Sequence, residues 1–183
     1  MKRLVLLLLV LIMACSKDMG LELINAAKAG DKAKVESLLA EGVDIGVKNE
    51  NGLTPLIAAS YKGHADVVSF LLDKGANINE KNTNETTSLI VAARYGRAEV
   101  VKVLLDKGAD ANITNTWGKA ALTWAAENNH VEIVKNLVAK GADVNLADKF
   151  GQTPLFLAKE SQKKQKNQKN SEIIKILIDA GAK

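Results

Sequence analysis

Hydrophobic residues recur along this chain at one fixed spacing. Leucine occupies five positions that are each thirty-three apart, always in a similar apolar segment: Leu23, Leu56, Leu89, Leu122 and Leu155. Four glycines keep the same spacing at the end of a second apolar segment: Gly42, Gly75, Gly108 and Gly141. A helix–turn–helix unit of this length cannot bury its own apolar face, so copies must stack and share one core. The pattern therefore predicts five stacked copies of one unit.

Polar and apolar positions within one copy predict two helices and a turn. Thr54 and Pro55 are typical of a helix start, because Thr caps free backbone N–H groups and Pro is tolerated in the first turn. Gly63 predicts the end of that helix. A second helix, ending at Gly75, is indicated by apolar residues at helical spacing: Val67, Val68, Leu71 and Leu72.

These features closely resemble the ankyrin repeat. The family motif is matched by NGLTPLIAASYKGH at 51–64, by FGQTPLFLA at 150–158 and by LLDKGAD at 104–110. The resemblance covers about residues 20–183 and implies an all-α fold, an ankyrin-repeat solenoid of helix–turn–helix units with β-turn tips. It implies five repeats including the caps, at about 20–48, 49–81, 82–114, 115–147 and 148–183.

The chain also departs from the family motif. The unit at 115–147 has Ala120 and Ala121 in place of Thr-Pro and Asn129 in place of Gly, which predicts lower local stability. The family's His after Thr-Pro-Leu is absent, so the hydrogen bonds that it makes between repeats are not expected. The residues at its positions are Ile57, Ile90, Thr123 and Phe156.

The last unit contains an insertion. Leu56 and Val67 are 11 positions apart, whereas their counterparts Leu155 and Ile173 are 18 apart, so seven extra residues lie within SQKKQKNQKNS at 161–171. This Lys/Gln/Asn-rich segment has no apolar residue. Its composition favours a solvated loop or a lengthened helix end over a contact with an anionic ligand.

The segment at 1–14 has the pattern of a secretory signal peptide. Lys2 and Arg3 precede an apolar run over 4–13, and a small residue, Ala14, follows. Ten apolar residues fall short of the roughly 20 that span a bilayer. We therefore assign the segment at 1–14 to targeting and not to the fold.

The sequence Ile12-Met13-Ala14-Cys15 resembles the bacterial lipobox. The resemblance implies cleavage before Cys15, lipidation of Cys15 and a short tether over 15–19, with Ser16 favouring the outer membrane. It implies an exported protein, held in the bacterial envelope facing the periplasm or the surface, whose membrane contact is the lipid alone. The alternatives are an ordinary signal peptide with an incidental Cys, or an uncleaved anchor.

Charge and cysteine content exclude several classes of function. The chain has one Cys, so it forms no intramolecular disulfide. Residues 16–158 contain 16 basic and 18 acidic residues, so the body of the fold is slightly acidic although the whole chain carries +4. A slightly acidic scaffold has no face that follows phosphates, which excludes a nucleic-acid partner.

The sequence shows no arrangement typical of catalysis, and we predict a non-enzymatic protein with no cofactor and no metal. His64 and His130 occupy the same repeat position at the start of the second helix, where a His fixes a turn or cap more often than it binds a metal. Neither Cys nor a carboxylate cluster completes a site beside them. The glycines recur at turn positions in phase with the repeat.

The ankyrin resemblance also implies where a partner binds. In that family the turn tips and the exposed end of the first helix form a concave groove. The corresponding tip positions here are Glu50, Asn51, Leu53, Thr83, Asn84, Thr86, Thr116, Trp117, Lys119, Lys149, Phe150 and Gln152. The corresponding first-helix positions are Tyr61, Lys62, Arg94, Tyr95, Glu127 and Asn128.

Aromatic residues concentrate on this predicted groove. Only 4% of the chain is aromatic, yet four of these positions are Tyr61, Tyr95, Trp117 and Phe150. Aromatic anchors with an Arg nearby are the usual composition of a binding hot spot. The alternative is that Trp117 and Phe150 pack across adjacent turns and stiffen the scaffold. Trp124 replaces a core Leu of the family and is expected to be buried.

These observations predict a non-enzymatic, monomeric protein-interaction module that is tethered to the bacterial envelope and binds a protein partner through the concave groove. Two alternatives from other classes remain. The chain could serve as an accessory or protective factor for an envelope enzyme such as a catalase, which some exported ankyrin proteins resemble. It could also be a surface protein that faces a host.

Overall fold

A computed structural model describes residues 18–164 and 168–183, which form helices and turns with no β-strand among them. The predicted signal peptide, Cys15 and the first part of the tether lie outside the described residues. No helix in the described ranges is long and apolar enough to cross a membrane. A helix over 18–29 comes first. It is followed by α2 (Lys32–Ala40), α3 (Pro55–Lys62), α4 (Ala65–Asp73), α5 (Ser88–Arg94), α6 (Ala98–Asp106), α7 (Ala121–Glu127), α8 (Val131–Ala139), α9 (Pro154–Lys164) and α10 (Gln168–Asp179).

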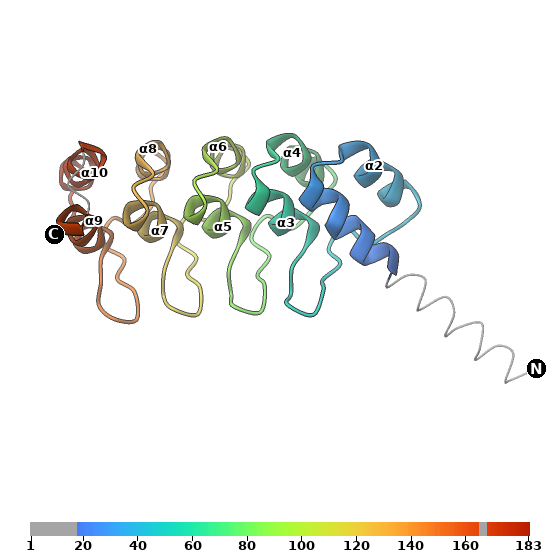
Figure 1. The fold of residues 1–183 in the computed structure, drawn as a ribbon, viewed down its shortest axis with the longest axis horizontal. Helices are drawn as coiled ribbons and strands as arrows, with labels where there is room; N and C mark the ends of the chain where they lie inside the picture. Colours follow the sequence, from blue (N-terminus) through green and yellow to red (C-terminus); the bar gives the residue numbers. More distant parts are fainter. Residues whose placement is uncertain (1–17, 165–167) are drawn as a thin grey trace, which may run out of the picture.

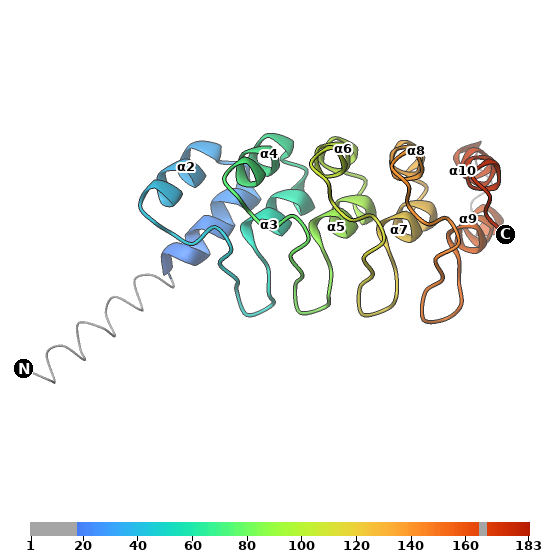
Figure 2. The same cartoon turned by 180° about the vertical axis from the view of Figure 1, so that it is seen from behind.

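The helices form two stacked rows. An inner row contains α3, α5, α7 and α9, and an outer row contains α4, α6, α8 and α10 (Figure 1). Long turns project from the inner row on the side away from the outer row, and Figure 2 shows the same arrangement from behind. From α3 to α8, each helix contacts its pair partner and the equivalent helix of the next unit. This confirms the predicted all-α solenoid of helix–turn–helix units.

The predicted start and end signals act as expected in most units. The Thr54 hydroxyl accepts a hydrogen bond from Ile57 N–H at 3.2 Å, and Pro55 follows it in the first turn. Thr87 caps α5 in the same way. The start of α7 differs, because Ala120 has no side-chain acceptor. The missing cap agrees with the lower stability that the sequence predicts for this unit.

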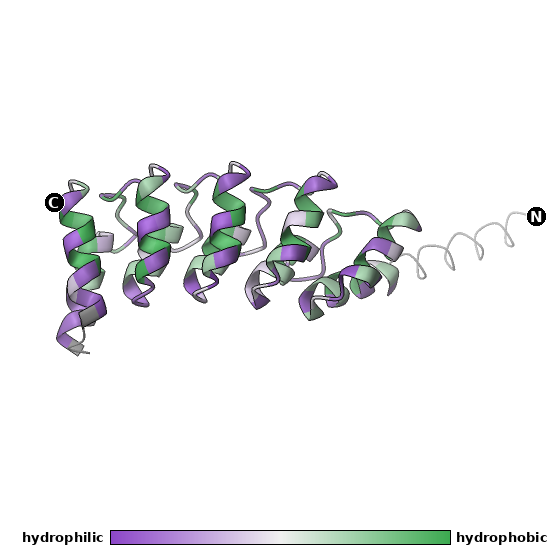
Figure 3. Ribbon diagram, turned by 90° about the horizontal axis from the view of Figure 1, so that it is seen from above, coloured by the Kyte–Doolittle hydropathy of each residue, from purple (hydrophilic) through white to green (hydrophobic). Residues whose placement is uncertain are grey.

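One core runs through the stack. The five leucines that define the period are all buried, with exposed fractions between 0 and 5%. Small side chains such as Ala59 and Ala93 are fully buried between them and allow the inner helices to approach closely. The outer helices bury one stripe and expose the other, which Figure 3 shows as green hydrophobic and purple hydrophilic positions on each helix.

Side chains at the start of the outer helices connect each unit to the preceding one. Each of these side chains bonds to a backbone carbonyl oxygen near the end of the first helix of the preceding unit. The pairs are His64 Nε2 and Lys28 O at 3.1 Å, Arg97 Nε and Tyr61 O at 3.0 Å, and His130 Nε2 and Arg94 O at 3.3 Å. Neither His caps its own helix. The predicted structural role of these two residues is thus a bond between units and not a cap.

The insertion in the last unit lengthens both of its helices. The α9 helix has 11 residues and α10 has 12, compared with 8 for α3 and 9 for α4. The longer ends are joined where Gln162 Nε2 donates to Ser171 Oγ at 2.9 Å. Of the two alternatives, the described residues show the lengthened helix, and residues 165–167 lie outside the description.

The fold also begins earlier than expected. Asp18 and Met19, which the sequence assigns to the tether, already belong to the helix over 18–29. Met19 is partly buried against the core. Helical structure is therefore already present at Asp18, three positions after Cys15.

Candidate protein-binding groove

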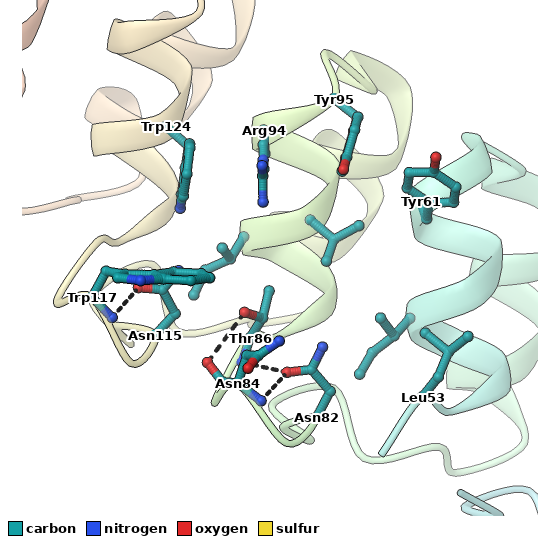
Figure 4. Close-up of a pocket in the computed structure, with 13 residues that line it drawn as sticks. Leu53, Tyr61, Asn82, Asn84, Thr86, Arg94, Tyr95, Asn115, Trp117 and Trp124 are labelled. Carbon is teal, nitrogen blue, oxygen red and sulfur yellow. Dashed lines mark hydrogen bonds between the residues drawn. The ribbon is translucent and has the colours of Figure 1, made fainter. Parts of the chain in front are cut away.

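The inner helices and the turn tips enclose a pocket of about 200 Å³, which we call the central pocket. Its walls come from three consecutive units, and Figure 4 shows inner-helix side chains above and tip side chains below. The lining residues are Leu53, Ile57, Tyr61, Asn82, Asn84, Thr86, Ile90, Val91, Arg94, Tyr95, Asn115, Trp117 and Trp124.

Each tip is shaped by one side chain at its base. Asn82 Oδ1 accepts hydrogen bonds from the backbone N–H groups of Asn84 and Thr86, both at 2.9 Å. Asn115 Oδ1 does the same for Trp117 at 3.0 Å and Lys119 at 3.1 Å. These bonds fold the segment into a tight turn of the type that Asn and Asp favour. The same residue therefore shapes the turn and lines the pocket.

Backbone hydrogen bonds join one tip to the next. Thr116 N–H donates to Asn84 O at 3.1 Å, and Lys149 N–H donates to Trp117 O at 3.0 Å. Gly118 makes this approach possible, because a Cβ there would lie 2.8 Å from Lys149 N and its φ is +75°. At the equivalent position of the preceding tip, Glu85 adopts a φ of 55°, a left-handed conformation that is uncommon for a residue other than Gly. The tips consequently form a continuous wall.

Aromatic rings line the opposite side of the central pocket. Tyr61 and Tyr95 meet edge to face, with ring centroids 4.6 Å apart and an interplanar angle of 86°. Tyr95 is 42% exposed and Trp117 is 43% exposed, whereas Tyr61 is only partly exposed. Rings held in this way present apolar area at little further cost in side-chain entropy when a partner binds.

Trp124 corrects an expectation from the sequence. The family pattern predicts that it is buried in the core, but it is only partly buried and lines the central pocket. Its position corresponds to Val91, which also lines the pocket, and the Trp124 side chain packs against the core as well as lining the groove. The core position is occupied by the preceding residue, Thr123, which is fully buried.

Two cations flank the Trp124 ring. The Arg94 guanidinium lies 4.4 Å from the ring centroid, and Lys119 Nζ lies 4.6 Å from it. Lys119 also forms an ion pair with Glu127 at 2.6 Å, and its side chain is only 12% exposed. Arg94 is exposed and has no acidic partner within the described part of the chain. The two cations therefore differ, because only the charge of Lys119 is compensated.

The structure brings together seven of the residues predicted to bind a partner. They are Leu53, Tyr61, Asn84, Thr86, Arg94, Tyr95 and Trp117. Lys119 and Glu127 lie beside them through the contacts with Trp124. Six lining residues are not among those predicted: Ile57, Asn82, Ile90, Val91, Asn115 and Trp124. Two of these, Asn82 and Asn115, carry a signal in the sequence, because Asn or Asp recurs in phase with the repeat at Asn49, Asn82, Asn115 and Asp148.

The other predicted residues lie outside the central pocket. Phe150 lies at the last tip, apart from the aromatic residues of the central pocket. Its side chain is 74% exposed, so its ring does not pack firmly across the adjacent turn. Two residues line a different pocket near the first helix, Glu50 and Asn51. The remainder are outside these two pockets: Lys62, Thr83, Thr116, Asn128, Lys149 and Gln152.

Ion pairs on the outer row lower the pKa of two carboxyl groups. A hydrogen bond from Lys107 at 2.6 Å holds the pKa of Asp73 below its usual value. A hydrogen bond from Lys140 at 2.8 Å lowers the pKa of Asp106 in the same way. Both pairs join neighbouring outer helices on the surface away from the groove. They belong to the scaffold and not to the candidate site.

Comparison with known families agrees with the helix pairs and the tip geometry. A family model described as ankyrin repeats, in three copies, matches residues 23–115 and again 105–183. The chain belongs to the ankyrin-repeat family. Ankyrin repeats generally serve as scaffolds that bind other proteins and are typically not enzymes. No curated protein matches the sequence.

The described part of this ankyrin chain shows no alternative chemical site. It contains no group of three or more His, Cys, Asp or Glu side chains placed to hold a metal ion. The two histidines are engaged with carbonyl oxygens of the preceding unit. The central pocket, which brings together seven of the residues predicted to bind a partner, is the candidate functional site.

Proposed function

We propose that this ankyrin protein is a non-enzymatic module that binds a protein partner in the central pocket and is tethered to the bacterial envelope by a lipid on Cys15. One observation carries the binding part: three consecutive units direct aromatic side chains, of which Tyr95 and Trp117 are exposed, and a cation without an acidic partner into one pocket. Side chains of this type form the energetic centre of many protein interfaces.

The tether is supported by the sequence before the fold. Lys2 and Arg3, the apolar run over 4–13 and the single Cys of the chain at position 15 stand in the order that lipid attachment requires. Asp18, in the first described helix, stands three positions after Cys15, a span of roughly 10 Å at most when extended. A lipid on Cys15 would hold the ankyrin stack close to the membrane surface.

Partner capture tests the binding part. The tagged full-length chain would be expressed in its own envelope, crosslinked, and compared with Trp117→Ala and Phe150→Ala. Both variants remove one exposed aromatic ring from a tip, but only Trp117 lines the central pocket. We expect Trp117→Ala to lose a specific envelope protein that the wild type and Phe150→Ala both retain. Capture of the same proteins by all three forms would refute the proposed site.

Membrane fractionation tests the tether. Replacing Cys15 with Ser removes the thiol to which the lipid would be attached, so we expect the protein to move from the membrane to the soluble fraction. Incorporation of a labelled fatty acid into the wild type, and its absence from Cys15→Ser, provides the matching control. A Cys15→Ser variant that stays in the membrane with the segment at 1–14 intact would instead indicate an uncleaved anchor.

A further inference from the structure

We propose that the central pocket recognises an acidic side chain, Asp or Glu, that stands next to an apolar residue in the partner polypeptide. This inference rests on the proposed binding function and specifies the chemistry of the partner. It follows from three properties of the pocket: the hydrogen-bond donors that it offers, its net charge and its apolar lining residues.

Several polar groups in the pocket offer hydrogen-bond donors, and the Tyr61 and Tyr95 hydroxyls can either donate or accept. The Oδ1 atoms of Asn82 and Asn115 each accept two backbone hydrogen bonds, so each side chain has only its Nδ2 donor left to offer. Trp124 Nε1 also has no hydrogen-bond partner, although it is buried in the unbound protein, and Figure 4 shows it on the edge of the ring directed toward Trp117. A carboxylate accepts at both oxygens and can use these donors.

The charge of the pocket is positive. Arg94 is the only charged residue among its lining residues. The nearby carboxylate of Glu127 is already paired with Lys119 at 2.6 Å, so it does not neutralise Arg94. A guanidinium binds a carboxylate through two parallel hydrogen bonds, which makes this contact stronger than a neutral one.

Arg94 is also held in position before a partner arrives. Its guanidinium lies 4.4 Å from the Trp124 ring centroid and 5.4 Å from the Tyr95 ring centroid. Figure 4 shows the Arg94 side chain between these two aromatic residues, pointing toward the tips. An arginine ordered by stacking loses less conformational entropy on binding than a free one. The pocket therefore presents a preorganised cation.

The rest of the pocket is apolar and small. Leu53 contributes partly exposed aliphatic surface next to the rings, and Ile57 and Ile90 are lining side chains that are almost fully buried. The volume of about 200 Å³ is below the roughly 300–1,000 Å³ typical of sites for drug-sized ligands. It suits individual side chains of a polypeptide, one acidic and one apolar, and not a separate small molecule.

The chain has an intrinsic reporter for this site, because both of its Trp residues line the central pocket. Tryptophan fluorescence of the full-length protein would be titrated with short peptides that contain no Trp and have blocked ends. The peptides share one sequence with a central Leu-Glu pair, and the Glu is replaced by Gln, Lys or phosphoserine in the others. Glu and Gln differ in charge but hardly in shape.

We expect the Glu peptide to bind about tenfold or more tightly than the Gln peptide, the range of one charge-assisted hydrogen bond. Arg94→Gln should abolish this preference, and Arg94→Lys should restore only part of it because Lys lacks the planar fork. Lys102→Gln is the matched control, since it removes an exposed cation from the outer helix of the same unit. It should keep the wild-type preference.

Each other outcome overturns the inference in a distinct way. Equal affinity for Glu and Gln peptides, with binding still lost in Trp117→Ala, would refute the acidic preference and leave the proposed binding site intact. Tighter binding of phosphoserine than of Glu would assign the pocket to phosphorylated partners. A fluorescence signal that no peptide changes would contradict both the inference and the central pocket as the binding site.

Discussion

The outer row of helices and the groove differ in how faithfully their side chains repeat. On the outer row, the pair Asp73 and Lys107 recurs one unit later as Asp106 and Lys140, with similar geometry. In the groove, one inner-helix position is Tyr61, then Arg94, then Glu127 in successive units. The outer row thus repeats one ion pair over two successive interfaces, whereas the groove changes its side chain in each of three successive units.

The backbone beneath both regions is the same. Tip-to-tip hydrogen bonds recur in phase at 3.2, 3.1 and 3.0 Å, and the bonds from His64, Arg97 and His130 connect each inner helix to the next unit. Stability of such a solenoid is close to a sum of units and their interfaces. Residues that repeat therefore build the stack, and residues that do not repeat are free to serve recognition.

The largest effect on the scaffold is expected in the core. Leu104 on α6 is fully buried, so Leu104→Ala should lower the free energy of unfolding by about 2–5 kcal/mol. Lys102→Ala, two positions away and exposed, should change it by less than about 0.5 kcal/mol. Chemical denaturation followed by circular dichroism measures both. A loss below about 1 kcal/mol for Leu104→Ala would show that the repeating core is not what holds this unit.

A smaller gain is expected where the repeating pattern is broken. Ala120 stands where Thr54 and Thr87 cap their helices, and all three positions are buried to a similar extent. Ala120→Thr should raise the free energy of unfolding by about 1 kcal/mol by restoring the cap. Ala120→Val has nearly the same shape but no hydroxyl and should give no such gain. Equal stability of the Thr and Val variants would contradict a capping effect.

The smallest effect concerns the ion pairs of the outer row. The pKa of Asp106 in the folded protein is lowered by its hydrogen bond to Lys140, so the pair stabilises the fold above the usual Asp pKa of 3.8. This contribution is lost as the pH falls from that value through the lower pKa of the folded state. Asp106→Asn should therefore reduce the difference in Tm between pH 7 and pH 3. An unchanged difference would show that the exposed pair contributes nothing measurable.

The fold could be predicted from the sequence because its signals repeat. Thr54, Gly63 and the five leucines each have counterparts in several units, so one pattern confirms another. The groove could be predicted only in part, because residues such as Arg94 and Trp117 that distinguish it do not repeat, although Asn82 and Asn115 do. The sequence predicts that Trp124 is buried, but it is only partly buried, because it packs against the core and lines the pocket at once. The sequence alone does not show how far neighbouring helices cover each position of a short helix.

Phe150 illustrates the same limit. It stands one repeat after Trp117, so the sequence groups the two residues together. The pocket ends before Phe150 because its wall requires aromatic side chains from the inner helices as well as from the tips. One unit after Tyr95 and Trp124, the equivalent residues are Asn128 and Leu157, and Leu157 is buried. Contacts between units, and not the repeat position alone, determine where the pocket lies.

Site-specific photocrosslinking tests most directly the claim that the groove binds the partner and the outer row does not. A photoreactive phenylalanine derivative would be placed at position 95 in the central pocket and, separately, at position 102 on the outer face of the same unit. Illumination of cells that express each full-length variant should yield a discrete crosslinked protein from position 95 and none from position 102. The same crosslink from both positions, or a crosslink from position 102 alone, would contradict the account.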